Sequence, residues 1–122
     1  MVTNKIGKKE SASKSSSKND LLATRDALEV LNGCWKLQIL VSLIEGTKRF
    51  RQISKEIDGI SDKMLSKELK DLETNQLVKR TVNDTFPPTV EYAVTEHTGS
   101  LKNVISELRD WGLLHRKKII GK

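Results

Sequence analysis

The sequence predicts a mainly α-helical domain with one small β-hairpin, in the order α-α-α-α-β-β-α. Three observations predict this class. Apolar residues recur at helical spacing in several segments, and two later runs alternate apolar and polar residues around a Pro-Pro loop. Only 4% of the 122 residues are aromatic, so the core must be mainly aliphatic. A chain of this length supports one domain with a modest core.

The first twenty residues differ in composition from the rest. Their five lysines and two acids supply half of the formal net charge of +6, and they contain many serines and almost no apolar residues. Such a segment cannot bury enough apolar surface to fold. We therefore expect a disordered Lys/Ser-rich tail over residues 1–20 and a folded domain over residues 21–122.

Two helices are predicted to begin the domain. The first spans Leu21–Leu31, with Asp20 as its cap, and ends at Asn32-Gly33. The second, Trp35–Ile44, is apolar on nearly all sides and should occupy the centre of the domain. Cys34, the only cysteine, excludes an intrachain disulfide and fits a reducing compartment, and we expect it to be buried and inert.

A helix-turn-helix is predicted next. Thr47–Arg49 forms a short extended link that leaves room for a β bridge, and a third helix begins at Phe50. Gly59 permits the positive φ of a tight turn. Ser61 caps a fourth helix, Ser61–Thr74, and Asn75 is expected to end it in a left-handed conformation. The apolar stripes of the two helices are formed by Phe50, Ile53, Ile57, Ile60, Leu65, Leu69 and Leu72.

Two strands and a last helix complete the domain. Leu77–Val82 and Val90–Val94 alternate with a period of two, and the seven-residue connection between them suits a wing. Phe86 in this loop is expected to pack on the domain. One long helix should run from Thr95 to Lys118. Its apolar surface exceeds what one small core uses, so we expect it to form a homodimer interface together with the first helix.

A helix-turn-helix followed by a wing is typical of DNA-binding proteins, in which the second helix enters the major groove. Lys48 and Arg49 precede the first of these helices and suit phosphate contacts, while Arg80 lies at the base of the wing, whose loop carries Asp84 but no basic residue. An ordinary solvated helix face is the alternative interpretation. Short and basic side chains on the outward face of the fourth helix suit base and phosphate contacts: Ser61, Lys63, Ser66, Lys67 and Lys70.

Other classes of function find little support. His97 and His115 are far apart and lack the neighbours of a metal site, and there is neither a Gly-rich phosphate loop nor a nucleophile with its base. We expect no enzymatic activity, cofactor or metal. Apolar runs are too short to span a bilayer, and no secretory signal is present, so a cytoplasmic protein without membrane contact is expected.

A set of short motifs spread over the chain carries a family resemblance: Cys34-Trp35-Lys36-Leu37, Lys48-Arg49-Phe50, Gly59-Ile60-Ser61, Met64-Leu65, Leu69, Leu72-Glu73, Leu77-Val78, Arg80-Thr81-Val82, Pro87-Pro88-Thr89-Val90-Glu91-Tyr92 and Thr95. With these motifs the chain resembles the HxlR family of bacterial winged helix-turn-helix transcriptional regulators. This resemblance implies a dimer built from the first and last helices. Some members sense oxidants through a cysteine that aligns with Leu22 here, so this mechanism is not carried over to the chain. Thr89 and Asn83–Thr85 are less basic than is usual in the wing.

Two functional hypotheses follow. The first is a sequence-specific regulator that binds double-stranded DNA as a homodimer and reads a (pseudo)palindromic site with the helix Ser61–Thr74. The alternative is a winged helix that binds other proteins and has no specific DNA contact. Steep salt dependence of binding would favour the first hypothesis, because phosphate contacts release counterions. The sequence identifies no small-molecule effector.

Overall fold

The computed structural model describes residues 14–121, and the chain divides into two units, residues 1–32 and residues 33–122. In the first unit, α2 (Lys14–Val30) is a helix that begins before the predicted start at Leu21. The helix therefore includes residues 14–20, which the sequence analysis assigned to the tail. Asp20 lies inside the helix, where its carbonyl oxygen accepts a hydrogen bond from Thr24 Oγ1 (2.8 Å), and is not its cap. The predicted disorder of residues 1–13 lies outside the described residues.

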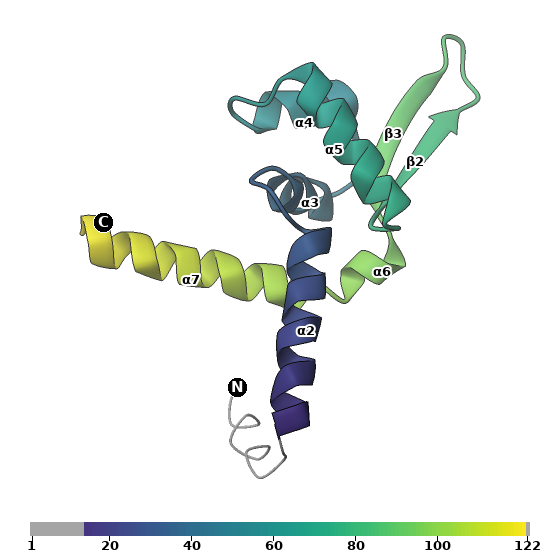
Figure 1. The fold of residues 1–122 in the computed structure, drawn as a ribbon. Coiled ribbons are helices and arrows are strands. Elements are labelled where there is room, and N and C mark those ends of the chain that lie inside the picture. Colours follow the sequence, from purple (N-terminus) through teal and green to yellow (C-terminus); the bar gives the residue numbers. More distant parts are fainter. Residues whose placement is uncertain (1–13, 122) are drawn as a thin grey trace. The chain divides into compact units, whose positions relative to one another are not determined.

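The second unit combines helices with a small antiparallel sheet (Figure 1). The predicted class is confirmed, and the predicted link before the third helix is itself a short strand that adds to the hairpin. The strands lie in the order β1-β3-β2. The elements are α3 (Lys36–Ile44), β1 (Lys48–Arg49), α4 (Phe50–Glu56), α5 (Asp62–Thr74), β2 (Val78–Asn83), β3 (Thr89–Val94), α6 (Glu96–Gly99) and α7 (Lys102–Ile120).

An aliphatic core holds these elements together, as the composition predicts. The central helix α3 supplies three fully buried side chains, and α4 and α5 pack their predicted stripes against it. Burial of aliphatic side chains is the main favourable term in folding. The buried apolar residues are Ile39, Leu40, Leu43, Ile53, Ile57, Leu65, Leu69, Leu72, Leu77, Val78 and Ile105.

The turn and caps of the helix-turn-helix follow local chemistry. Gly59 has φ +84°, as predicted for the tight turn. Ser61 caps α5, since its Oγ accepts a hydrogen bond from Met64 N (3.1 Å). The predicted left-handed residue at the end of α5 is wrong by one position. Gln76 (φ 63°) adopts this conformation, and the amide of Leu77 donates to the carbonyl of Leu72 (2.9 Å), which makes a Schellman ending.

The strands of the wing differ by one residue from the predicted ones: β2 lies one position later than Leu77–Val82, and β3 begins one position before Val90. β2 pairs with β3 from Val78–Val94 to Asn83–Thr89, and β1 pairs with the other edge of β3. Figure 1 shows α5 beside this hairpin, whose tip extends beyond the helices. Phe86, which was expected to pack on the domain, is fully exposed in the loop. The strands remain paired as far as Asn83 and Thr89, so the loop that carries Phe86 stands at the end of the hairpin and not against the domain.

The predicted last helix is two helices. Thr95 caps the short α6, and its hydroxyl donates to the carbonyl of Gln76 (2.7 Å), while the buried Thr98 hydroxyl donates to the carbonyl of Leu77. These bonds tie α6 to the start of β2, and the chain changes direction before α7. Within α7 only Ile105 is buried. Among the residues that the structure describes, no helix is long and apolar enough to cross a membrane.

Candidate nucleic-acid interface

The outward face of α5 carries the predicted DNA-contacting side chains. Lys63, Ser66, Lys67 and Lys70 are spaced by three or four residues, so they share one face of the helix, and all four are exposed. The opposite face holds the buried leucines. The N-terminal end of α5 is also exposed at Ser61. A helix with this division can place one polar face against a ligand while the other remains in the core.

Lys67 lies next to a carboxylate on the same helix. Its Nζ is 3.2 Å from Asp71 Oδ2, and the Lys67 side chain keeps 63% of its surface exposed. The hydrogen bond from Lys67 is the main reason why the pKa of Asp71 lies below its ordinary value, and Lys36 adds to the effect. The ion pair is exposed and can open when an external anion competes for the lysine.

A buried ion pair fixes the inner face of α5. Lys36 of α3 donates to Glu68 Oε1, with 7% and 9% of the two side chains exposed, and its Nζ is 3.5 Å from Asp71 Oδ2. Burial alone would lower the pKa of Lys36, but the hydrogen bonds and charges of Glu68 and Asp71 outweigh it and raise the pKa. This pair joins the central helix to the helix that faces outward.

Sequence reasoning did not identify this ion pair. The signal was present, because Glu68 occupies the leucine stripe of α5 at the spacing of Leu65, Leu69 and Leu72, and Lys36 begins an otherwise apolar helix. A charged residue at a stripe position needs a partner of opposite charge. The partner itself could be recognised only once the packing of α3 on α5 was known.

Arg80 lies close to the same face of α5. A cleft of about 280 Å³ between α5 and the sheet is lined by Ser66, Lys70, Arg80 and Tyr92, together with Glu73. Arg80 lies opposite Tyr92 in the pairing of β2 with β3, and both residues line this cleft. The structure therefore brings three predicted site residues from two elements to one cleft.

Lys48 and Arg49 differ from each other. The Lys48 side chain is only 11% exposed, and its ammonium lies 2.6 Å from Glu56 Oε2 and 3.1 Å from Glu45 Oε1. The hydrogen bond from Lys48 to Glu56 is the largest influence on its pKa, which is raised. This ammonium is already neutralised, so Lys48 is a poor candidate for a phosphate contact. Arg49 is exposed at the start of α4 and remains a candidate.

Cys34 is exposed, so the predicted burial is wrong. It lies in the turn before α3, where the neighbouring Trp35 takes the half-buried position at the N-cap. The Gln38 amide donates to the carbonyl of Cys34 at 2.6 Å. Between residues 14 and 121, no group of three or more His, Cys, Asp or Glu side chains could hold a metal ion.

Comparison with known proteins gives consistent matches. The HxlR-like helix-turn-helix model matches residues 30–119. The HTH-type transcriptional regulator YtcD of Bacillus subtilis is 34% identical, over 82% of this chain and 79% of YtcD. YkvN of the same organism, also an HTH-type transcriptional regulator, is 42% identical, over 69% of this chain and 71% of its own. The reduced form of the redox regulator HypR aligns with a TM-score of 0.76 at 30% identity, covering 82% of this chain and 99% of HypR.

Proposed function

The chain belongs to the HxlR-like helix-turn-helix family, and from this premise we propose that it is a DNA-binding transcriptional regulator whose helix α5 enters the major groove. The observation that carries this assignment is the division of α5 into a buried leucine face and an exposed Ser/Lys face. A regulator of this kind acts on the chromosome, so we also propose a cytoplasmic location.

Each residue that we assign to the DNA contact on α5 or at its N-cap has a role that suits its size and charge. Ser61 and Ser66 are short and let the helix approach the base pairs closely. Lys63 and Lys67, in the first half of the helix, reach base edges or phosphates, because recognition helices contact bases mainly through their N-terminal residues. Lys70 is nearer the C-terminal end and is assigned to the phosphate backbone.

Contacts outside α5 position the domain on the duplex. Arg80 shares a cleft with Lys70, which supports a joint contact of the two side chains with one backbone segment. Arg49 suits a phosphate contact at the start of α4. Phe86 stands fully exposed at the wing tip beside Asp84, so we assign the tip an apolar contact with the sugar backbone and no charged one.

A homodimer is the second part of the proposal. In α7, Val104, Leu108 and Trp111 form an exposed apolar stripe, with exposed fractions of 50–59%. In α2, considered by itself, Leu21 and Leu28 lie on the same helical face, two turns apart, and are 70% and 64% exposed. Exposed apolar stripes on helices are typical of protein interfaces. Two-fold symmetry would double the DNA contacts and match a (pseudo)palindromic site.

Selection of double-stranded DNA from a random pool with the full chain tests the proposal. We expect one enriched motif with two related half-sites about one helical turn apart, and binding that weakens steeply as salt rises. A single unrepeated half-site would refute the dimer but not the DNA contact. Absence of any enriched motif, together with salt-insensitive behaviour, would instead favour a protein-interaction module, for which the weakly basic wing is the supporting observation.

A further inference from the structure

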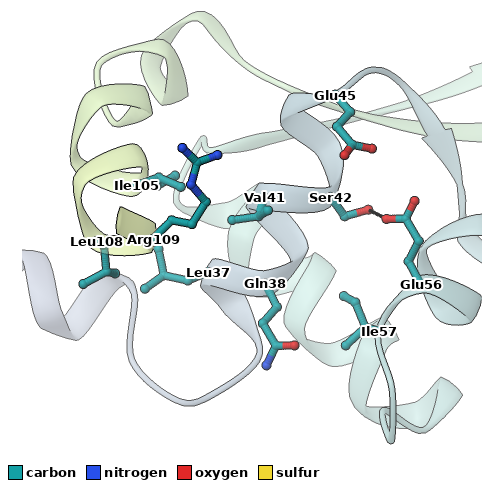
Figure 2. Close-up of a pocket in the computed structure, with 10 residues that line it drawn as sticks. All are labelled: Leu37, Gln38, Val41, Ser42, Glu45, Glu56, Ile57, Ile105, Leu108 and Arg109. Atoms are coloured by element: carbon teal, nitrogen blue, oxygen red, sulfur yellow. Dashed lines mark hydrogen bonds between the residues drawn. The ribbon is translucent and has the colours of Figure 1, made fainter. Parts of the chain in front are cut away.

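A groove of about 350 Å³ lies between α3, the end of α4 and α7 (Figure 2). Its walls are mainly apolar and come from all three helices: Leu37, Val41, Ile57, Ile105 and Leu108. Small-molecule sites commonly have volumes of about 300–1,000 Å³, apolar walls and a few polar groups. The proposed DNA contact uses none of these residues.

The groove continues along α7. An adjoining hollow of about 250 Å³ shares Val41, Glu45, Ile105 and Arg109 with the first and also reaches Lys102. An elongated apolar body can therefore lie along the helix with its polar end at either hollow.

The carboxylates of the groove are already satisfied. Glu56 accepts hydrogen bonds from Lys48 Nζ (2.6 Å) and from Ser42 Oγ (2.6 Å), the second of which is drawn in Figure 2. The first of these bonds is the main reason why the pKa of Glu56 is lowered. Glu45 accepts from the same Lys48 at 3.1 Å. Both groups therefore carry their negative charge against a neighbouring cation.

Arg109 is the cation that lines the groove, and its own ion pair is weak. Its guanidinium bonds to the adjacent Asp110 (3.0 Å from Nη2), and the two side chains are 67% and 57% exposed. Such exposed pairs contribute little. Arg109 and Lys102 are the two cations that line the hollows, whereas the lining carboxylates Glu45 and Glu56 are held by Lys48 from outside the lining. An anionic ligand could therefore replace the exposed Asp110 at the guanidinium without breaking a buried ion pair.

We propose that this groove binds a small amphipathic carboxylate, whose apolar body packs on Val41, Ile57 and Leu108 and whose carboxylate pairs with Arg109. A guanidinium can bind a carboxylate through two parallel hydrogen bonds. The ligand would join α4 of the helix-turn-helix to α7, which carries the proposed dimer stripe. An effect on DNA affinity rests on the proposed function and is reciprocal, since DNA must change ligand affinity by the same factor.

Titration of the full chain with benzoate, 2-naphthoate and octanoate, followed by methyl NMR, tests the site. We expect saturable shifts at Val41, Ile57 and Leu108. Arg109→Gln should weaken carboxylate binding about tenfold or more, because it removes a charged hydrogen bond. The neutral 2-naphthamide should bind with equal affinity to both forms. Arg116→Gln, the same substitution at another exposed position of α7, should leave all affinities unchanged.

Several outcomes would overturn the proposal. These are no saturable shift with any of the three carboxylates, equal losses in Arg109→Gln and Arg116→Gln, or shifts that appear only when the protein is diluted, which would mean that a second copy fills the groove. For the effector role, DNA affinity should change at least threefold with saturating carboxylate, and an unchanged affinity would refute that role. A chain that binds no DNA would refute the proposed function, while the NMR result would still stand.

Discussion

At the residue scale, Lys67 is the most informative position of the proposed interface. It is exposed on the outward face of α5, and its ion pair with Asp71 lies on the surface. Lys67→Glu should reduce specific DNA affinity by about 100-fold or more, since it removes a contact of about 1–3 kcal/mol and adds repulsion from the phosphates. Gel retardation on the selected site at moderate salt measures this loss.

Lys55→Glu is the matched control for this substitution. It makes the same change of charge at an exposed position in α4, away from the outward face of α5. Its effect on affinity should be small, and both variants should melt cooperatively near the parent temperature. If Lys67→Glu bound its best site as well as Lys55→Glu does, the assignment of α5 to the major groove would be wrong.

The ion pair of Lys36 and Glu68 stabilises the fold and is buried. Water therefore cannot solvate the charge that remains when one partner is removed. Lys36→Ala or Glu68→Ala should lower the free energy of unfolding by about 3–5 kcal/mol, since each leaves a buried charge unpaired. The double variant Lys36→Met/Glu68→Leu should recover most of this loss. Urea denaturation of the three variants measures these differences, and a double variant as unstable as the sum of the single ones would contradict this view.

At the element scale, Glu56 and Lys48 join α4 to β1. The pKa of Glu56 is lowered from 4.5, chiefly by the hydrogen bond from Lys48 and then by Ser42. The folded state therefore binds this proton less readily than the unfolded state. The stability that the pair contributes is complete above pH 4.5 and is lost as the pH falls through the folded pKa.

Glu56→Gln should remove this pH dependence. The variant should be less stable than the parent at neutral pH, and the difference should shrink as the pH is lowered below 4.5. Glu107→Gln, at an exposed position of α7, is the control and should follow the parent profile. Thermal melts across this pH range measure the effect. A constant difference between Glu56→Gln and the parent would mean that the pair has no ionic component.

Elements with regular apolar spacing could be predicted from the sequence. Local sequence determines several of these features, because each depends on residues within one or two helical turns. They are the apolar stripes of α4 and α5, the Ser61 cap and the Gly59 turn. The division of the last helix could not be predicted in this way. It depends on hydrogen bonds from Thr95 and Thr98 to backbone groups about twenty positions earlier in the chain.

Within the candidate site, the positions set by helical spacing could be predicted from the sequence, and those set by the packing of several elements could not. The sequence placed Ser66, Lys67 and Lys70 on one exposed helix face, since that follows from helical spacing alone. It could not distinguish Lys48 from Arg49, because the neutralisation of Lys48 depends on how α3, β1 and α4 meet. Exposure of Phe86 likewise depends on how far the hairpin extends beyond the core.

At the scale of the whole molecule, α7 leaves an unusual amount of apolar surface exposed for a single chain. Val104, Leu108 and Trp111 recur at the spacing of one helix face, and the Trp111 ring stacks on His115 with centroids 4.8 Å apart. Leu113 is just as exposed, at 61%, but lies on the opposite face. The proposed dimer thus predicts different results for two similar substitutions.

Trp111→Glu should convert the protein to a monomer at micromolar concentration, because a charge in the centre of an apolar interface would lose its hydration without a partner. Leu113→Glu should leave the dimer intact, although it introduces the same charge only two residues away, because that position lies on the opposite face of α7. Sedimentation equilibrium distinguishes the two. The monomeric variant should also bind a full palindromic site no better than a half-site, because a monomer carries only one α5 and cannot contact both half-sites at once. If both variants stayed dimeric, the interface would have to exclude this face of α7; if both became monomeric, the stripe would not be what selects the partner.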